Sequence, residues 1–314
     1  MSRTGMIMAA AVTIALVGAG TGVYFFLDQD QAVGIEIKDQ FEVGDKHERI
    51  MEFNRIVYEI SNITKVGEDL KFDVNEDPAA SDLTYDDLRD YILNEITFDA
   101  SSIDAIEGDE TQTSTAFGDR DCVVYTQDYG SGYKDIFYVG KNNDIIYKEE
   151  YLIDDEVVVR RVLQKSSLLL ESNTDIGLKE AGEIKEGDST SSKLMLISTL
   201  TIEKVNLSDG DAPVTYDVRI SGGFLYDHMT RDEILEEAYL ILPEDAENSE
   251  KGVVTERVST PLGKVNCDVY LLTEFPGYDV KFYVSNDVLL MISGGFLNET
   301  TRIYWEYTDL VVRS

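Results

Sequence analysis

The chain has few of the residues that build stapled folds and metal sites: two cysteines, two histidines, five prolines and one tryptophan among 314 residues. Two cysteines exclude a disulfide-rich scaffold and a four-cysteine zinc site, and two histidines leave little for histidine-based metal chemistry. Basic residues are also scarce, with 27 Lys and Arg against 61 Asp and Glu, for a net charge of −34. Such a chain cannot neutralise nucleic-acid phosphates at scale, so a nucleic-acid partner is excluded.

The composition that remains is that of a folded, strand-rich protein. Hydrophobic residues make up 43% of the chain and aromatic residues 10%, with 18 tyrosines among them. This is enough apolar material for packed cores, and tyrosine favours strands. The length predicts about two domains. The acidic residues most simply form a solvated exterior, because no ordered calcium loop occurs; the sequence predicts no cofactor and no metal site.

An uncharged run of 23 residues, 5–27, lies near the N-terminus. At about 1.5 Å per helical residue it spans a hydrocarbon core of ~30 Å. Arg3 precedes the run and Asp28 and Asp30 follow it, which predicts a cytoplasmic N-terminus and an extracytoplasmic remainder. We therefore predict that residues 1–27 anchor a single-pass protein in the cell membrane. A cleaved signal peptide is the alternative, and it also places residues 28 onward outside.

The sequence contains an internal repeat. Residues 118–139 align with residues 263–284 without a gap at an offset of 145, and nine of the 22 positions are identical. The match extends upstream through three further pairs: Gly44-Asp45 with Gly187-Asp188, Asn62 with Asn206, and Thr84 with Thr230. Each copy has the length of an ordinary domain. We therefore predict two homologous domains at 41–165 and 184–314, with a linker at 166–183 and a juxtamembrane stalk at 28–40.

Each predicted domain combines several short strands with one helix. Runs of alternating apolar residues predict antiparallel strands. Thr84 and Thr230 each begin a stretch with helical spacing, and an acidic residue three positions later predicts a capped N-terminus. The predicted fold class is therefore α+β. It comprises an N-terminal transmembrane helix and two tandem homologous antiparallel β-meander domains, each with one helix packed on a curved sheet.

Two cysteines occupy equivalent positions of the repeat. Cys122 and Cys267 lie on strands at positions predicted to face the core. We expect two buried thiols that act as small apolar groups. The alternative is an inter-domain disulfide, which an external compartment permits.

The same strands carry two pairs of tyrosines, Tyr125 with Tyr138 and Tyr270 with Tyr283. The alternation predicts that each pair shares the outer face of its sheet. There the rings either pack under neighbouring loops or form an exposed aromatic recognition patch.

Three sequons make Asn62, Asn206 and Asn298 candidates for glycosylation on a protein exposed outside the cell. No phosphate-binding loop, nucleophile elbow or metalloprotease motif occurs, so no catalytic residue is predicted. His47 and His228 are not repeat equivalents, and neither belongs to a recognisable nucleophile–base motif.

The uncharged N-terminal run, the opening Gly-Asp and the Gly-x3-Cys-x-Val-Tyr run ahead of Phe-Tyr-Val together carry a resemblance. In these features the chain resembles membrane-anchored surface proteins of archaea built of tandem β-meander repeats. A curved meander that holds a helix is also similar, in architecture only, to the half-barrel of lipoprotein carriers. Neither resemblance implies catalytic residues in this chain.

The sequence therefore predicts a non-enzymatic, membrane-anchored surface protein that binds a partner or helps to build the cell envelope. Its ligand would be a protein, a glycan or a lipid. The alternative is a carrier that holds a hydrophobic, lipid-like ligand between helix and curved sheet. That alternative requires an apolar cavity of a few hundred Å³ in each domain.

Overall fold

The computed structural model describes residues 32–75, 80–101, 104–171, 176–207, 213–242, 250–272, 279–296 and 299–314. Strands make up 66% of these residues and helices 9%. The expected β-sheet content is confirmed, but the predicted α+β class is wrong, because the protein is mostly β. The predicted transmembrane helix at 5–27 lies outside the described residues. Within them, no helix is both long enough and apolar enough to cross a membrane.

The same order of elements occurs twice along the chain. The first half contains β2 (Lys46–Val66), β3 (Asp69–Asn75), β4 (Ala80–Leu83), α3 (Tyr85–Ile96), β5 (Ile106–Thr115), β6 (Gly118–Gly130), β7 (Tyr133–Gly140), β8 (Ile146–Ile153) and β9 (Glu156–Leu163). The second half contains β12 (Ser189–Asn206), β13 (Thr215–Ile220), β14 (Phe224–Met229), α4 (Arg231–Glu237), β15 (Glu250–Thr260), β16 (Gly263–Leu272), β17 (Asp279–Ser285), β18 (Val288–Phe296) and β19 (Glu299–Thr308). Four short strands and a 3-10 helix complete the described elements: β1 (Ile35–Ile37), β10 (Leu169–Glu171), β11 (Ile176–Leu178), η1 (Ala181–Glu183) and β20 (Val311–Arg313).

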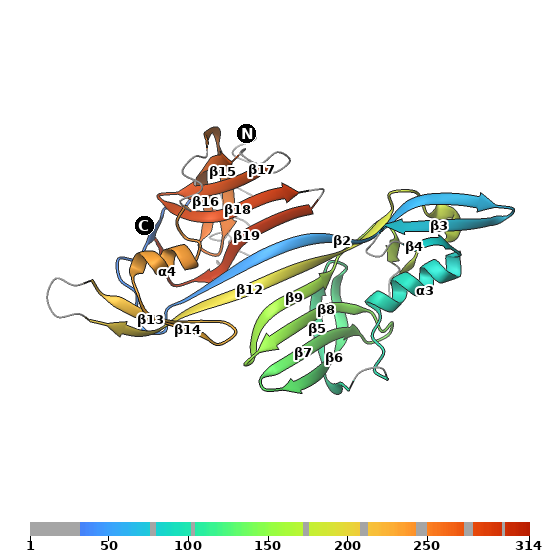
Figure 1. The fold of residues 1–314 in the computed structure, drawn as a ribbon, viewed down its shortest axis with the longest axis horizontal. Helices are drawn as coiled ribbons and strands as arrows, with labels where there is room; N and C mark the ends of the chain where they lie inside the picture. Colours follow the sequence, from blue (N-terminus) through green and yellow to red (C-terminus); the bar gives the residue numbers. More distant parts are fainter. Residues whose placement is uncertain are drawn as a thin grey trace, which may run out of the picture.

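One sheet of 16 strands joins the two halves, and the long strands β2 and β12 pair antiparallel at its centre. Figure 1 shows β2 and β12 running from one group of strands to the other. The first part of β2 pairs with β19 and its last part with β3. Likewise, β12 pairs with β9 through its first part and with β13 through its last part. Each long strand therefore belongs to both groups.

We call the group around α3 lobe 1 and the group around α4 lobe 2. The core of lobe 1 combines α3 with β3, β6–β9 and the last part of β2. The core of lobe 2 combines α4 with β13, β15–β19 and the last part of β12. Because β9 pairs with β12 and β19 pairs with β2, the residues 41–165 and 184–314 exchange strands instead of forming two separate sheets.

Segments outside the two predicted domains also enter the cores. Ile35, from the predicted stalk 28–40, is fully buried in the core of lobe 2, and Leu168 and Ile176, from the predicted linker 166–183, are buried in that of lobe 1. β1, close to the first described residue, pairs with β20 near the C-terminus, and β10 pairs with β11 between the halves. Each lobe therefore has one short two-stranded ladder: β1–β20 packs on lobe 2, and β10–β11 packs on lobe 1.

Both helices begin with the capping box that the sequence predicts. The Thr84 hydroxyl accepts from the Asp87 N–H at 3.1 Å, and the Asp87 carboxylate accepts from the Thr84 N–H at 3.1 Å. Thr230 and Glu233 form the same pair at the start of α4. These bonds satisfy N–H groups that the first turn leaves without helical partners.

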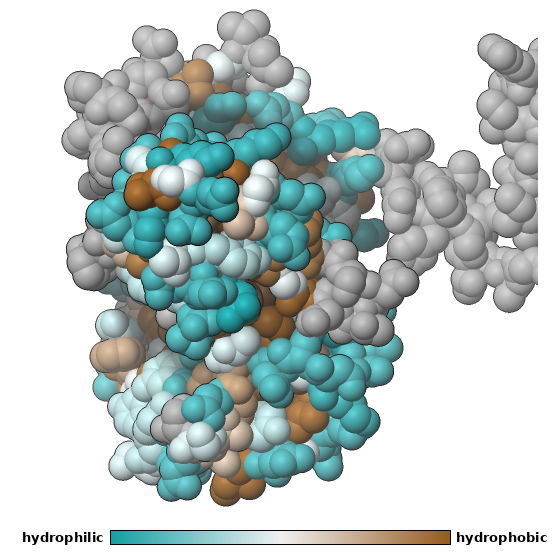
Figure 2. All heavy atoms as spheres, turned by 90° about the vertical axis from the view of Figure 1, so that its right-hand side faces the viewer, coloured by the Kyte–Doolittle hydropathy of each residue, from teal (hydrophilic) through white to brown (hydrophobic). Residues whose placement is uncertain are grey.

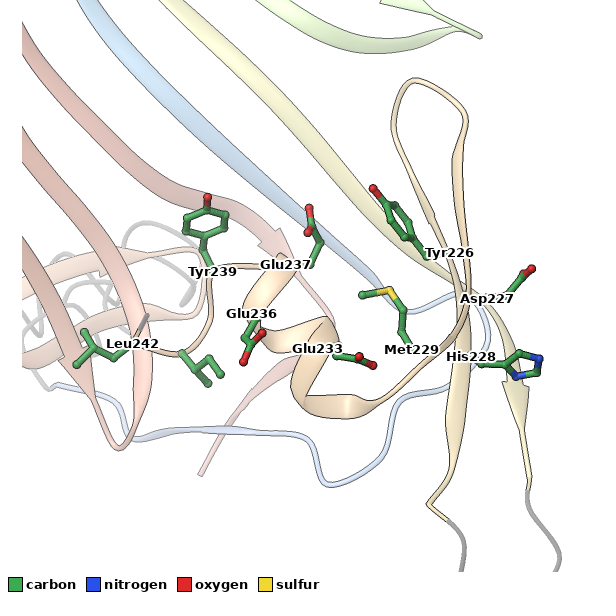
Figure 3. Close-up of a pocket in the computed structure, with 10 residues that line it drawn as sticks. Tyr226, Asp227, His228, Met229, Glu233, Glu236, Glu237, Tyr239 and Leu242 are labelled. Carbon is green, nitrogen blue, oxygen red and sulfur yellow. The ribbon is translucent and has the colours of Figure 1, made fainter. Parts of the chain in front are cut away.

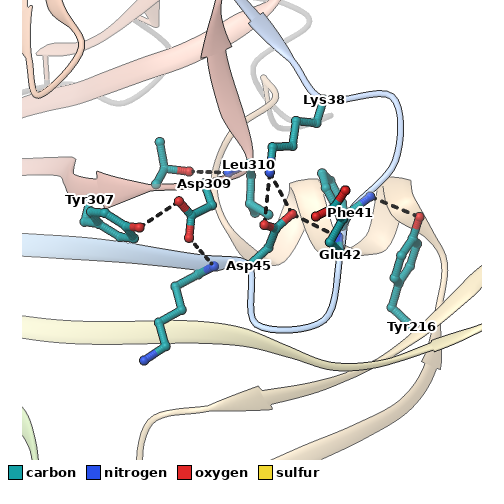
Figure 4. Close-up of polar contacts among 10 residues, drawn as sticks. Lys38, Phe41, Glu42, Asp45, Tyr216, Tyr307, Asp309 and Leu310 are labelled. Atoms are coloured by element: carbon teal, nitrogen blue, oxygen red, sulfur yellow. Dashed lines mark hydrogen bonds and ion pairs between the residues drawn. The ribbon is translucent and has the colours of Figure 1, made fainter.

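The repeated Gly-Asp motif fastens the entry of each long strand. The Asp45 carboxylate accepts from the Lys38 ammonium and from the Glu42 N–H, each at 3.0 Å (Figure 4). In the other half, Asp188 accepts from the Lys179 ammonium at 3.0 Å and the Lys185 N–H at 2.9 Å. Burial raises the pKa of Asp188, but these hydrogen bonds outweigh it and hold the pKa below its usual range.

The surface reflects the excess of acidic residues. Figure 2 views the molecule from the side of lobe 1, and hydrophilic residues cover most of that face with smaller apolar areas between them. A net charge of −34 repels anionic partners.

Candidate binding groove

The strand β14 exposes an unusual run of apolar side chains. Phe224 is 63% exposed, Leu225 70% and Tyr226 44%. The neighbouring strand β13 is different, since its Val218 and Ile220 are buried in the core of lobe 2. By the alternation of a strand, Phe224 and Tyr226 share one face and Leu225 lies on the other. Exposed apolar side chains on an edge strand typically mark an interaction site.

β14 is also an edge strand. Among the described strands it pairs with β13 alone, in the register Val218 opposite Tyr226 and Ile220 opposite Phe224. Near its end a bulge places His228 at a φ of +60°, and the His228 N–H donates to the Asp217 carboxylate at 3.2 Å. The outer edge of β14 therefore leaves backbone N–H and C=O groups for another strand.

A groove of about 880 Å³ lies along α4. Figure 3 shows α4 between β14 on one side and the segment 239–242 on the other, with Met229 directed toward the helix. Its lining combines apolar side chains with four carboxylates: Tyr226, Asp227, His228, Met229, Glu233, Glu236, Glu237, Tyr239, Ile241 and Leu242. Glu233 caps the helix, whereas Glu236 and Glu237 are exposed on it.

Tyr239, which lines the groove at the end of α4, has a strained backbone conformation. The Tyr239 N–H donates to the Glu236 carbonyl at 3.0 Å and the Leu240 N–H to the Leu235 carbonyl at 2.9 Å, the two bonds of a Schellman cap. The left-handed position of this cap favours glycine, but Tyr239 occupies it at a φ of +54°. The Arg49 guanidinium lies 4.3 Å from the centre of the tyrosine ring. Left-handed residues other than glycine cluster at functional sites.

The matching part of lobe 1 is built differently. β4, at the position of β14, consists of Ala-Ser-Asp-Leu, and its exposed residues are Ser81 and Asp82. α3 has 12 residues where α4 has seven, and Leu88, Ile92 and Ile96 along it are buried. Beside the end of α3 the described residues line a cavity of only about 30 Å³. The apolar edge and the large groove therefore distinguish lobe 2.

Two of the three sequon asparagines occupy equivalent sites with a structural role. The Asn62 amide donates to the Asp73 carboxylate at 2.9 Å, and the Asn206 amide donates to that of Asp217 at 2.7 Å. Both asparagines are half-buried, and the amide nitrogen in these bonds is the atom that would carry a glycan. Asn298 lies outside the described residues. Glycosylation stays a prediction at all three.

The cysteines lie in different cores. Cys122 belongs to the core of lobe 1 and Cys267 to that of lobe 2, and both are buried free thiols. The inter-domain disulfide offered as an alternative is not formed. Burial raises the pKa of Cys122, and it raises the pKa of Cys267 to about 11. Neither thiol is activated as a nucleophile.

The predicted shared face of the tyrosine pairs is wrong. In the β6–β7 register Tyr125 lies opposite Phe137 and Tyr138 opposite Val124, so the two rings point to opposite faces. Tyr125 packs on Phe98 at 4.5 Å between ring centres, whereas Tyr138 packs against the core of lobe 1.

The same correction applies to lobe 2. Tyr270 lies opposite Phe282, and Tyr283 lies opposite Val269 and is buried in the core. None of the four tyrosines is exposed, so they form no surface patch.

No family model, curated protein or solved structure matches the chain. In the described part of the chain, no group of three or more His, Cys, Asp or Glu side chains is placed to hold a metal ion. The groove was not predicted from the sequence. The one signal for it is that Phe224-Leu225-Tyr226 in the second half has no apolar counterpart in Ala80–Leu83 of the first.

Proposed function

We propose that this protein is a non-enzymatic binding protein that holds a partner protein in the groove of lobe 2. The observation that carries the proposal is the groove of about 880 Å³ beside an edge strand with three exposed apolar residues. Its mixture of apolar and charged lining is typical of a recognition site. An envelope-structural role is compatible with this proposal if the partner is another envelope component.

The groove offers no arrangement for covalent chemistry among its described residues. Its one histidine, His228, has its Nδ1 atom 3.4 Å from the Asn206 amide and 3.4 Å from the Thr215 hydroxyl, and it lies on the exposed strand. The nearby Asp217 carboxylate accepts from the His228 backbone N–H and from the Asn206 amide, and no described hydrogen bond joins it to the ring, so it does not orient the ring as a base. The chemistry of the groove is therefore better suited to recognition.

A carrier of hydrophobic ligands receives less support. The cavity beside α3 measures about 30 Å³, and the one around His47 in lobe 2 about 10 Å³. A lipid chain needs a few hundred Å³ of enclosed apolar space. The large groove of lobe 2 is open and lined in part by carboxylates, which disfavours an apolar ligand.

We further propose that the lobes lie outside the cytoplasmic membrane. This rests on the sequence alone: the uncharged run 5–27 with Arg3 before it and acidic residues after it. A membrane-impermeant amine reagent should label the protein on intact cells. Labelling that requires lysis would contradict this placement, without bearing on the groove.

Selection of random peptides on the full-length protein tests the binding function. Selected peptides should bind the wild type and fail to bind the Leu225→Ser/Tyr226→Ser variant. The matched control is Ile106→Ser/Tyr129→Ser, which removes two exposed apolar side chains from lobe 1 and should leave binding unchanged. Peptides that bind the groove variant as well as the wild type, or a selection that yields no binder, would refute the proposal.

A further inference from the structure

The edge of β14 is a ready-made template for another strand. Natural sheets normally protect such edges with charges, bulges, short length or a covering element. In lobe 1 the equivalent strand β4 has four residues and a polar sequence. In lobe 2, β14 has six residues and every residue from Phe224 to Asp227 is exposed.

The negative charge next to the open edge of β14 favours some incoming strands over others. Asp227 on β14 and Glu236 and Glu237 on α4 line the groove, and all three are exposed. The basic side chain of Arg49 at the end of α4 donates to the Glu237 carbonyl at 2.9 Å and stacks on Tyr239. An incoming lysine or arginine would find carboxylates in reach, whereas an acidic segment would be repelled.

The same charges disfavour a second copy of this chain. A symmetric pairing of β14 with β14 would bring the same carboxylates of the two copies together. Each copy also carries a net charge of −34, which adds long-range repulsion.

We propose that the groove receives an extended, basic segment of a partner protein, which adds to the sheet as a strand along the open edge of β14. Main-chain hydrogen bonds to β14 supply affinity, and alternate side chains of the segment reach the groove. Basic side chains on the face toward the groove approach Glu236 and Glu237, and apolar ones on the opposite face contact Leu225, which lies on the other face of β14 from Tyr226. This inference rests on the proposed binding function and specifies its ligand.

Three synthetic octapeptides test the inference on the full-length protein. The first alternates lysine and valine. The second has the same sequence with N-methyl groups on alternate backbone nitrogens, which removes strand donors and keeps the charge. The third carries glutamate in place of lysine. We expect the first to bind, and each of the other two to bind about tenfold more weakly or worse.

A charge-neutral pair of substitutions tests the protein side. Glu236→Gln/Glu237→Gln should weaken binding of the lysine peptide about tenfold and reduce its sensitivity to salt. The control Asp86→Asn/Asp90→Asn removes two exposed carboxylates from α3 and should leave binding unchanged. Hydrogen exchange at the amides of β14 should slow when the lysine peptide is bound.

The outcomes separate this inference from the binding function. If the N-methylated and lysine peptides bind alike, strand addition is refuted while a groove ligand remains. If the glutamate peptide binds equally well, the basic character is refuted. A concentration-dependent dimer lost in Leu225→Ser/Tyr226→Ser would show that a second copy occupies the edge instead. Failure of all three peptides, together with an empty peptide selection, would refute both proposals.

Discussion

Glu52 on β2 lies directly opposite Met195 on β12, and the two residues have the same offset of 143 as Asp45 and Asp188 of the repeat. Equivalent residues of two copies face each other only at a two-fold axis. An approximate two-fold axis therefore passes between the central strands at this pair. The axis is only approximate in chemistry, because Glu52 is buried and accepts from Lys193 and from the Tyr304 hydroxyl, each at 3.1 Å.

This arrangement makes a prediction about the isolated halves. The segment 184–314 contains β12 but not β2, its central partner in the sheet. Expressed alone, it should not fold as a monomer, because β12 and β19 would both lose β2, the strand that joins them in the sheet. Two copies can restore the ladder by pairing β12 with β12. We expect either an unfolded chain or a dimer by sedimentation, with the full-length chain as the control.

A folded, monomeric 184–314 segment would contradict the exchange of strands. Circular dichroism alone cannot decide between the outcomes, because a misfolded dimer also contains strands. Sedimentation and amide protection should therefore be measured on the same sample, and protection should appear only at concentrations at which the dimer forms.

The repeat in the sequence predicted where helices and strands lie better than it predicted which strands pair with one another. Thr84 and Thr230 both start helices with the expected capping boxes. The exchange of strands was not predicted, because a strand has the same alternation whichever half supplies its neighbour. The central strands run to 21 and 18 residues, and no local signal marks where each changes lobe.

Register explains the error in the tyrosine pairs. Alternation correctly places Cys122 and Tyr125 on opposite faces of β6, but it gives no relation between one strand and the next. A shift of one residue in β7 moves Tyr138 from the outer face to the core side. The candidate groove was missed for a related reason: Phe224-Leu225-Tyr226 reads as buried in sequence, and only its lack of a partner strand exposes it.

The two cysteines should behave as free thiols that reagents in solution cannot reach in the folded protein. Denaturing titration should find two free thiols per chain, and a reducing agent should leave the unfolding temperature unchanged. Native protein should react very slowly with thiol reagents, because both side chains are fully buried and their pKa values are raised. Loss of titratable thiol in material that has not been reduced would instead reveal a disulfide.

His47 should make stability depend on pH. The ring is buried in lobe 2, and burial lowers its pKa to about 3. Above about pH 6.5 the ring is neutral in both the folded and the unfolded state, so it adds no pH dependence to the free energy of unfolding. As the pH falls below that, only the unfolded state takes up the proton, so the free energy of unfolding drops by about 1.4 kcal/mol per pH unit.

The substitution His47→Thr tests this dependence, because Thr190 is the buried repeat equivalent in the other half. Urea unfolding from pH 7 to pH 4 should show a shallower loss of stability in the variant than in the wild type. His228→Ala, which removes the exposed histidine, should keep the wild-type slope. Equal slopes in wild type and His47→Thr would show that the ring does not titrate as described.

Tyr239→Gly should separate stability from binding. Glycine adopts the left-handed conformation of the Schellman cap freely, which favours the variant by about 1 kcal/mol. Loss of the Arg49 contact with the ring costs about 0.5–1 kcal/mol. The two effects oppose each other, so the free energy of unfolding should change by less than about 1 kcal/mol. Binding of a groove ligand should nevertheless weaken, because the variant removes an aromatic wall.

The Tyr239→Phe variant is the matched control, since it keeps the ring and the left-handed backbone and removes only the hydroxyl. It should bind the lysine–valine peptide as the wild type does. If Tyr239→Gly also bound normally, Tyr239 would serve only the helix end. If it unfolded much more easily than the wild type, the Arg49 contact would stabilise lobe 2 by more than the strain costs. The combination of normal stability and weakened binding is what a residue strained for recognition requires.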